Sequence, residues 1–260
     1  MTLRLRQTLA ILAAALVLAP AAGAQSPQDA VSAFCRLDAD GARLSAWDMQ
    51  RIAPLIGWPL EPAWDRVVLV NGYTVRAAVP LAPNRFEVAI DYAVVGSIDA
   101  DGFVGESRSE RVIVHVRRLL GAWRLVGIPF EPRLFANRVD TDGMRRILRG
   151  ERGGIRNSAL VFELMHAAAW DVPPESTRDL LSGGSYAAVD QPQAGDLAVY
   201  LRDGAPYHVG LLEAPGVVVS ATLAAGVVRA TLRTFAGEVR YLRLRREVAV
   251  LPQPPPTPTP

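Results

Sequence analysis

The spacing of the apolar residues changes once along the chain, and this change constrains the fold more than any other feature. Between Pro27 and about Pro54 the apolar residues recur three or four positions apart, and Ser26-Pro27 is a typical start of a helix. From Asp65 onward several stretches alternate between apolar and polar residues, which is the period of a strand. Helices followed by a series of antiparallel strands predict an α+β fold.

The alternating stretches also predict the individual strands. We expect a first strand over 67–70 that ends in a hairpin turn at Asn71-Gly72, because this dipeptide favours the tightest hairpin connection. The region 129–142 contains prolines and shows no clear period, so we place a domain boundary there. Between them the pattern predicts a strand over 86–95, a turn at Asp101-Gly102, and strands over 111–119 and 123–127.

The composition fits a globular protein and argues against a nucleic-acid-binding one. Half of the 260 residues are apolar and about a fifth are charged, as in an ordinary folded chain of one or two domains. All 28 basic residues are arginines and 26 residues are acidic, so the formal charge is only +2. Because the arginines are spread along the chain, without a basic stripe among aromatic residues, we expect no nucleic-acid partner.

The first 24 residues have the pattern of a secretory signal peptide. Arg4 and Arg6 precede an apolar run over 9–18, and the small residues 22–24 follow at the spacing of a signal-peptidase site. The run is about half as long as a membrane-spanning helix. We therefore expect cleavage after Ala24, no stable membrane insertion afterwards, and a mature chain in the periplasm or outside the cell.

Cys35 is the single cysteine, so it forms no intramolecular disulfide. Its neighbours Ala33, Phe34 and Leu37 are apolar and lie in the helical part of the chain. We therefore expect a buried thiol that behaves as a small apolar side chain on a helix.

The order of elements in residues 26–135, closed by a strand with the sequence Gly-x-Trp-Arg-Leu-Val-Gly, resembles the nuclear-transport-factor-like (SnoaL-like) cone fold. This resemblance implies helices packed into a bent sheet and a pocket that can hold a small molecule. Some members of that family are enzymes with an Asp-His pair, for which Asp91 and His115 are the candidates here. A lone histidine in a strand is more often a half-exposed residue on its face.

The second half carries a series of short motifs in a fixed order. A buried helix is predicted to open at Asn157, followed by a proline segment over 172–177, Gly195-Asp196-Leu197 and His208-Val209-Gly210. The series resembles the NlpC-type family of papain-like bacterial cell-wall peptidases over residues 143–250. The resemblance implies a papain-like α+β domain, so that the expected organisation is a signal peptide over 1–24, a cone domain over 26–135, an NlpC-type domain over 143–250 and an extended, proline-rich tail over 251–260.

In that family a thiolate at a helix N-terminus is the nucleophile, a histidine pairs with it, and a third polar group orients the histidine. The resemblance places Asn157 at the nucleophile, His208 at the base and Ser220 at the third position, while Arg156 stands where the family has an aspartate. An asparagine amide is no nucleophile at neutral pH. The resemblance therefore implies a peptidase-like domain that lacks the thiol chemistry.

Other residues are poor substitutes for the missing thiol. Ser158 would need a shift in helix register, since one residue turns a side chain by about 100°, and Cys35 would have to come from the other domain. Asn157 is equally suited to cap the helix, and His208 and Ser220 to lie on strand faces. The three histidines lack the spacing of a metal site, so we expect neither a metal nor a cofactor.

The preferred hypothesis is a secreted bacterial cell-envelope protein with a catalytically degenerate domain. In this hypothesis Asn157, Tyr207 and His208 bind peptidoglycan stem peptides or an envelope protein. One alternative is an active peptidoglycan hydrolase with a non-standard nucleophile. The other is an interaction protein whose ligand occupies the cone of the first domain.

Overall fold

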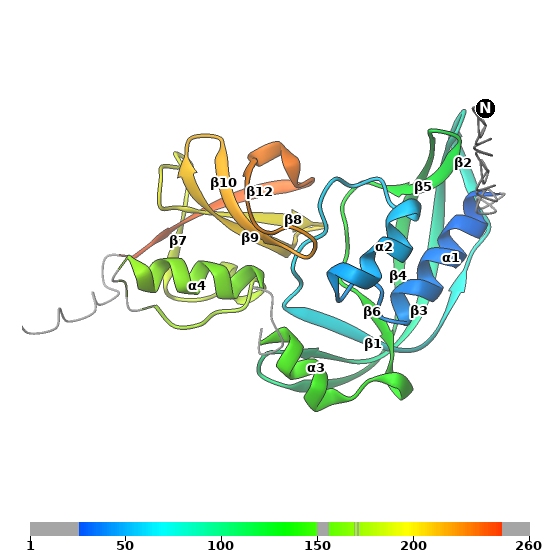
Figure 1. Cartoon of the computed structure of the whole chain (residues 1–260), viewed down its shortest axis with the longest axis horizontal. Helices are drawn as coiled ribbons and strands as arrows, with labels where there is room; N and C mark the ends of the chain where they lie inside the picture. Colours follow the sequence, from blue (N-terminus) through cyan, green and yellow to red (C-terminus); the bar gives the residue numbers. More distant parts are fainter. Residues whose placement is uncertain (1–25, 150–155, 169, 171, 246–260) are drawn as a thin grey trace, which may run out of the picture.

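The computed structural model describes residues 26–149, 156–168, 170 and 172–245. It has an α+β fold with two six-stranded sheets (Figure 1), which confirms the general fold class predicted from the sequence. The predicted signal peptide and proline-rich tail lie outside the described residues. Among the helices that the structure describes, none has the length and apolar character of a membrane span.

The first sheet has the strand order β5-β4-β3-β1-β6, with β2 paired to β3. Strands β1 and β6 run parallel, and the other pairs are antiparallel. The sheet is curled, α1 lies against it, and α2 packs beside α1 (Figure 1). Its strands are β1 (Arg66–Val75), β2 (Val79–Ala82), β3 (Arg85–Asp99), β4 (Phe103–Leu119), β5 (Ala122–Val126) and β6 (Arg133–Phe135).

One expectation for this sheet is wrong. Asn71-Gly72 forms no hairpin turn, because β1 continues through it and its ladder with β3 shifts register between Leu69 and Gly72. The extra residue is taken up by a β-bulge, which bends a strand without reversing the chain. The region 129–142, where the sequence predicts a domain boundary, contains β6, which pairs with β1.

The helices predicted before the sheet are confirmed as α1 (Pro27–Ala39) and α2 (Ala46–Ile52). Ser26 begins α1 with a capping box: its hydroxyl accepts from the backbone N–H of Asp29, whose carboxylate accepts from the N–H of Ser26. The other helical segments of this half are η1 (Ala53–Leu55), η2 (Ala136–Arg138) and α3 (Thr141–Leu148).

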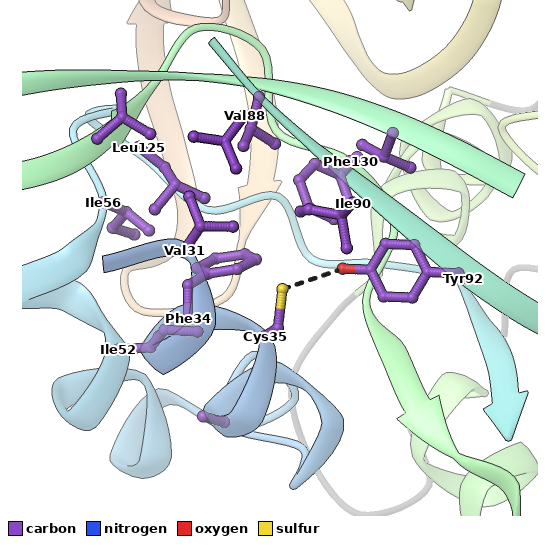
Figure 2. Packing of buried hydrophobic residues seen from close by; sticks show 14 of the residues in the cluster. Val31, Phe34, Cys35, Ile52, Ile56, Val88, Ile90, Tyr92, Leu125 and Phe130 are labelled. Atoms are coloured by element: carbon purple, nitrogen blue, oxygen red, sulfur yellow. Dashed lines mark hydrogen bonds between the residues drawn. The ribbon is translucent and has the colours of Figure 1, made fainter. Parts of the chain in front are cut away.

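The core of the first half lies between α1 and the curled sheet (Figure 2). Cys35 is 1% exposed within it, as predicted, and its Sγ lies 3.5 Å from the hydroxyl oxygen of Tyr92. Burial raises the pKa of the Cys35 thiol to about 12, so no thiolate forms at neutral pH. The core also contains Val31, Phe34, Ile52, Val88, Ile90, Leu125 and Phe130.

The second sheet has the order β11-β10-β9-β8-β12-β7, and all neighbours are antiparallel. The predicted helix is confirmed as α4 (Asn157–Ala167), which lies along one face of this sheet (Figure 1). The elements that follow are η3 (Asp179–Leu181), β7 (Tyr186–Val189), β8 (Leu197–Arg202), β9 (Ala205–Ala214), β10 (Val217–Thr222), β11 (Gly226–Thr231), η4 (Leu232–Thr234) and β12 (Glu238–Leu244).

Different parts of the chain cover the two faces of the second sheet. Successive side chains of a strand point to opposite faces. One apolar cluster joins α4 to the sheet and contains Val161, Met165, Leu197, Val199 and Val209. The cluster on the opposite face contains Trp64, Ala198, Tyr200, Val218 and Phe235. A residue next to Val209 along β9 therefore points away from α4.

Candidate functional site

His208 and Ser220 lie on neighbouring strands and point to the face opposite to α4. Ser220 pairs with Gly210, two residues after His208 on β9, so the two side chains share a face. A Cβ on Gly210 would collide with the Ser220 hydroxyl, which explains the glycine in this motif. The rings of His208 and Phe235 are 3.9 Å apart between centroids, and both His208 and Ser220 are fully buried.

Asn157 lies at the first turn of α4, on the other side of the sheet. Arg156 is the N-cap residue, and the cap has no side-chain hydrogen bond, so the expectation that Asn157 caps the helix is wrong. The backbone N–H of Asn157 instead donates to the carbonyl oxygen of Ala63 at 3.1 Å. Because α4 packs on the face of Val209, the structure separates Asn157 from the face that holds His208.

No hydrogen bond among the described atoms joins the three residues that the resemblance brought together. The amide group of Asn157, both ring nitrogens of His208 and the hydroxyl of Ser220 are buried and lack partners in the described part of the chain. Burial lowers the pKa of His208 to about 3, so the imidazole is neutral at physiological pH. This arrangement offers no nucleophile with an adjacent base.

A segment of the first half completes the second sheet, and we call residues 61–64 the clasp. Pro62 forms an antiparallel bridge with Thr222, and the N–H of Ala63 donates to the carbonyl oxygen of Ala221 at 3.3 Å. The ladder between β9 and β10 ends at Ser220, and the clasp pairs with β10 beyond that point. Ala63 therefore binds β10 through its N–H and α4 through its carbonyl oxygen.

The carboxylate of Glu61 holds the clasp in place. Its oxygens accept hydrogen bonds from Arg43 Nε at 2.7 Å, Trp58 Nε1 at 2.6 Å and Trp64 Nε1 at 2.5 Å. Arg43 is fully buried, and its guanidinium also lies 3.5 Å from the carboxylate of Asp38. A buried carboxylate with a charged partner and several donors is a well-satisfied group, so the clasp is firmly anchored to the first half.

A pocket of about 310 Å³ opens beside the clasp, between the two halves, and we call it the junction pocket. Tyr207, a binding residue expected from the sequence, lines it together with Trp64; their ring centroids are 6.3 Å apart. The hydroxyl of Tyr207 donates to the carbonyl oxygen of Ala236 at 2.6 Å, which fixes the ring. The remaining lining residues are Asp65, Arg66, Ser97, Asp99, Val104, Glu106, Glu131, Ser176, Arg178, Asp179 and Pro206.

The charged groups of the junction pocket differ in whether they already have an ion-pair or hydrogen-bond partner within the protein. Arg66 lies 3.2 Å from Glu131 and 3.4 Å from Glu106, so it is neutralised within the wall. Asp65 accepts from the backbone N–H and the hydroxyl of Thr177, which ties the wall to the second half. Arg178 is exposed and has no ion-pair partner within 4 Å among the described residues, while its charge acts on the nearby Glu106. Its guanidinium can therefore bind an anionic group of a ligand.

The candidate pair of the first half is not assembled. Asp91 accepts hydrogen bonds from Arg111 and Arg76, which lower its pKa to about 2. His115 pairs with Glu87 across β3 and β4, four residues along β3 from Asp91. Both groups are occupied by surface partners, as expected for strand-face residues.

The sequence offered only weak signals for the residues that build the junction. Trp58, Glu61 and Trp64 fall in a short segment without helical or strand period, and Arg43 lies in a loop between two helices. Two tryptophans and a glutamate within seven residues were the available hint, since large aromatic residues in a linker need a place to be buried. No feature of the sequence singles out Arg43 among the 28 arginines as the partner of Glu61.

Comparisons with protein-family models, with curated proteins and with solved structures find no match to this chain.

Proposed function

We propose that this chain is a secreted, non-catalytic relative of the NlpC-type cell-wall peptidases, preceded by a SnoaL-like domain, and that it binds peptidoglycan peptides in the cell envelope. The ligand binds in the junction pocket and not at Asn157, His208 and Ser220. A chain segment of a partner envelope protein is the other occupant that such a pocket could take, and the experiment below separates the two.

Three features argue against hydrolysis at the positions that the resemblance indicates. Asn157 offers no nucleophile, and α4 and His208 lie on opposite sides of the sheet. His208 is fully buried, with its pKa lowered to about 3 by desolvation, so it is a poor proton acceptor at neutral pH. Cys35 is buried in the core of the first half, so its thiol does not replace the missing nucleophile.

The observation that carries the proposal is the junction pocket itself. It is concave, near the lower end of the usual size range for ligand pockets, and lined by residues of both halves. It combines two aromatic rings, Trp64 and Tyr207, with carboxylates and the unpaired Arg178. Peptides present both charged termini and apolar side chains, so a mixed lining of this kind suits a short peptide.

The test uses the mature chain, residues 25–260, with peptidoglycan sacculi and defined muropeptides. Product release is followed by mass spectrometry and retention by pull-down. Arg178→Ala removes the free cation of the pocket, and Arg233→Ala removes an exposed arginine elsewhere as the matched control.

We expect retention without release, weakened by Arg178→Ala and unchanged by Arg233→Ala. Release of products would contradict the non-catalytic assignment. Failure to bind either the sacculi or the muropeptides would contradict peptidoglycan as the ligand and favour a protein partner.

A further inference from the structure

The indole of Trp64 connects the buried charges of the first half with the junction pocket. The residue is 2% exposed, packs with Tyr207, lines the pocket, and donates its N–H to Glu61 Oε1 at 2.5 Å. A hydrogen bond to a carboxylate fixes the ring plane as well as its place. Any shift of Glu61 therefore moves a wall of the pocket.

The position of Glu61 depends in turn on Arg43. The Arg43 Nε and terminal nitrogen both lie 2.7 Å from Glu61 Oε1, and the terminal nitrogen also donates to the carbonyl oxygen of Phe130 at 2.5 Å. The guanidinium carbon lies 5.2–5.8 Å from the ring centroids of four aromatic residues: Phe34, Trp58, Trp64 and Phe130. A planar guanidinium whose forked N–H groups donate to two fixed acceptors, and which lies close to four aromatic rings, has a single orientation.

From this chain of contacts we propose that Arg43 is a positioning residue for the junction pocket: through Glu61 it holds Trp64 in the pocket wall and so sets the affinity for the ligand. Arg43 does not line the pocket and acts only through its neighbours. This inference rests on the proposed function for the location of the ligand, while the contacts that carry it belong to the first half.

The test compares two buried arginines that differ in their link to Trp64. Arg43→Lys keeps the charge and loses the fork, because one ammonium group cannot reproduce the planar donors to Glu61 and the Phe130 carbonyl. Arg133→Lys is the control: Arg133 is 4% exposed in the same half, pairs with Glu110 and donates to the backbone carbonyl oxygen of the pocket-lining Glu131. It therefore lies as close to the pocket as Arg43 does, but it donates no hydrogen bond to Glu61. Affinity for a defined muropeptide is measured well below the melting temperature of each variant.

We expect both variants to melt at lower temperature and only Arg43→Lys to lose affinity, by about tenfold, the size of a typical coupling between side chains in contact. In a Trp64→Phe background, which lacks the indole donor, Arg43→Lys should have little further effect on affinity. Equal losses from Arg43→Lys and Arg133→Lys, or an undiminished effect in the Trp64→Phe background, would overturn the inference.

A measurement without ligand tests the positioning role of Arg43 separately from the proposal that the pocket binds peptidoglycan peptides. Quenching of tryptophan fluorescence by acrylamide is compared between Arg43→Lys and Arg43→Lys/Trp64→Phe, so that the difference reports on Trp64. We expect Trp64 to become more accessible in Arg43→Lys and to stay protected in Arg133→Lys. Protection in both variants would overturn the positioning role, whereas increased access without any muropeptide binding would sustain it and refute the proposed ligand alone.

Discussion

The backbone N–H of Asn157 donates a 3.1 Å hydrogen bond to the carbonyl oxygen of Ala63, and through it the first half of the chain satisfies the start of α4. The N–H groups of a first helical turn have no partner within the helix. Here one of them binds the clasp, whose Trp64 also fills the second half's apolar cluster. The second half is thus completed by residues that precede it by about a hundred positions.

This dependence predicts that the second half does not fold alone. A fragment of residues 136–260 lacks the Ala63 hydrogen bonds and the Trp64 side chain, whose loss from a core costs about 3–5 kcal/mol. We expect no cooperative thermal transition by circular dichroism, and a transition that appears when a synthetic peptide of residues 58–66 is added. A sharp transition of the fragment without the peptide would show that the clasp is dispensable.

A cysteine introduced at position 157 should not produce peptidase activity. In Asn157→Cys the new thiol lies at the start of α4, while His208 points to the opposite face of the sheet and stays neutral. A thiol without a nearby base remains mostly protonated at neutral pH. We expect no muropeptide cleavage by Asn157→Cys, with Asn157→Ser as the isosteric control. Cleavage by the cysteine variant alone would mean that α4 and His208 meet in solution.

The burial of His208 predicts acid sensitivity. Below pH 6.5 an unfolded chain protonates this histidine, whereas the folded chain does so only near pH 3, so the free energy of unfolding falls by up to about 1.4 kcal/mol per pH unit from this group. Asp38 acts in the opposite direction: burial raises its pKa to about 6, so the folded chain takes up that proton first and gains stability as the pH falls.

His208→Leu isolates the contribution of this histidine to the pH dependence of the free energy of unfolding. We expect urea unfolding to show equal or higher stability than the parent at pH 7, because two buried nitrogens without described partners are removed. Between pH 6.5 and 4 the advantage of the variant should grow. His115→Leu, at a half-buried histidine in β4 of the other half, provides the control. A constant difference across this range would argue that His208 titrates normally.

Cys35 should be unreactive in the folded chain. Its thiol is 1% exposed, and burial raises its pKa to about 12. We expect no labelling by a thiol reagent at about pH 8 in native buffer and one label per chain in denaturant. Rapid labelling of the native protein would indicate that α1 opens from the sheet.

The local part of this fold was predictable from the sequence because it depends on neighbours along the chain. The cap at Ser26, the helical spacing around Cys35 and the turn at Gly102 are such signals, and each corresponds to an element boundary or a buried face. Asn71-Gly72 was misleading because its partner strand β3 holds it in a bulge. Pairing with β3 overrode the preference of the dipeptide for a hairpin turn.

The site was less predictable for two reasons. It depends on which face of the sheet each strand residue occupies, and on ion pairs between residues that are not neighbours in the sequence. The motif His208-Val209-Gly210 fixes a strand, but only the packing of Val209 against α4 shows to which side His208 points. Likewise, the pairing of Arg43 with Glu61 bridges 18 positions and has no local pattern. Tyr207 was identified from the sequence for a groove beside His208 and lines the junction pocket instead.

The most direct test of the central claim is a fluorescence titration of the mature protein with a defined muropeptide, comparing His208→Leu with Trp64→Phe. The account predicts that His208→Leu binds as tightly as the parent, and that Trp64→Phe, which alters the wall of the junction pocket, binds more weakly. Loss of binding in His208→Leu with normal binding in Trp64→Phe would contradict it and would place the ligand at the face of His208.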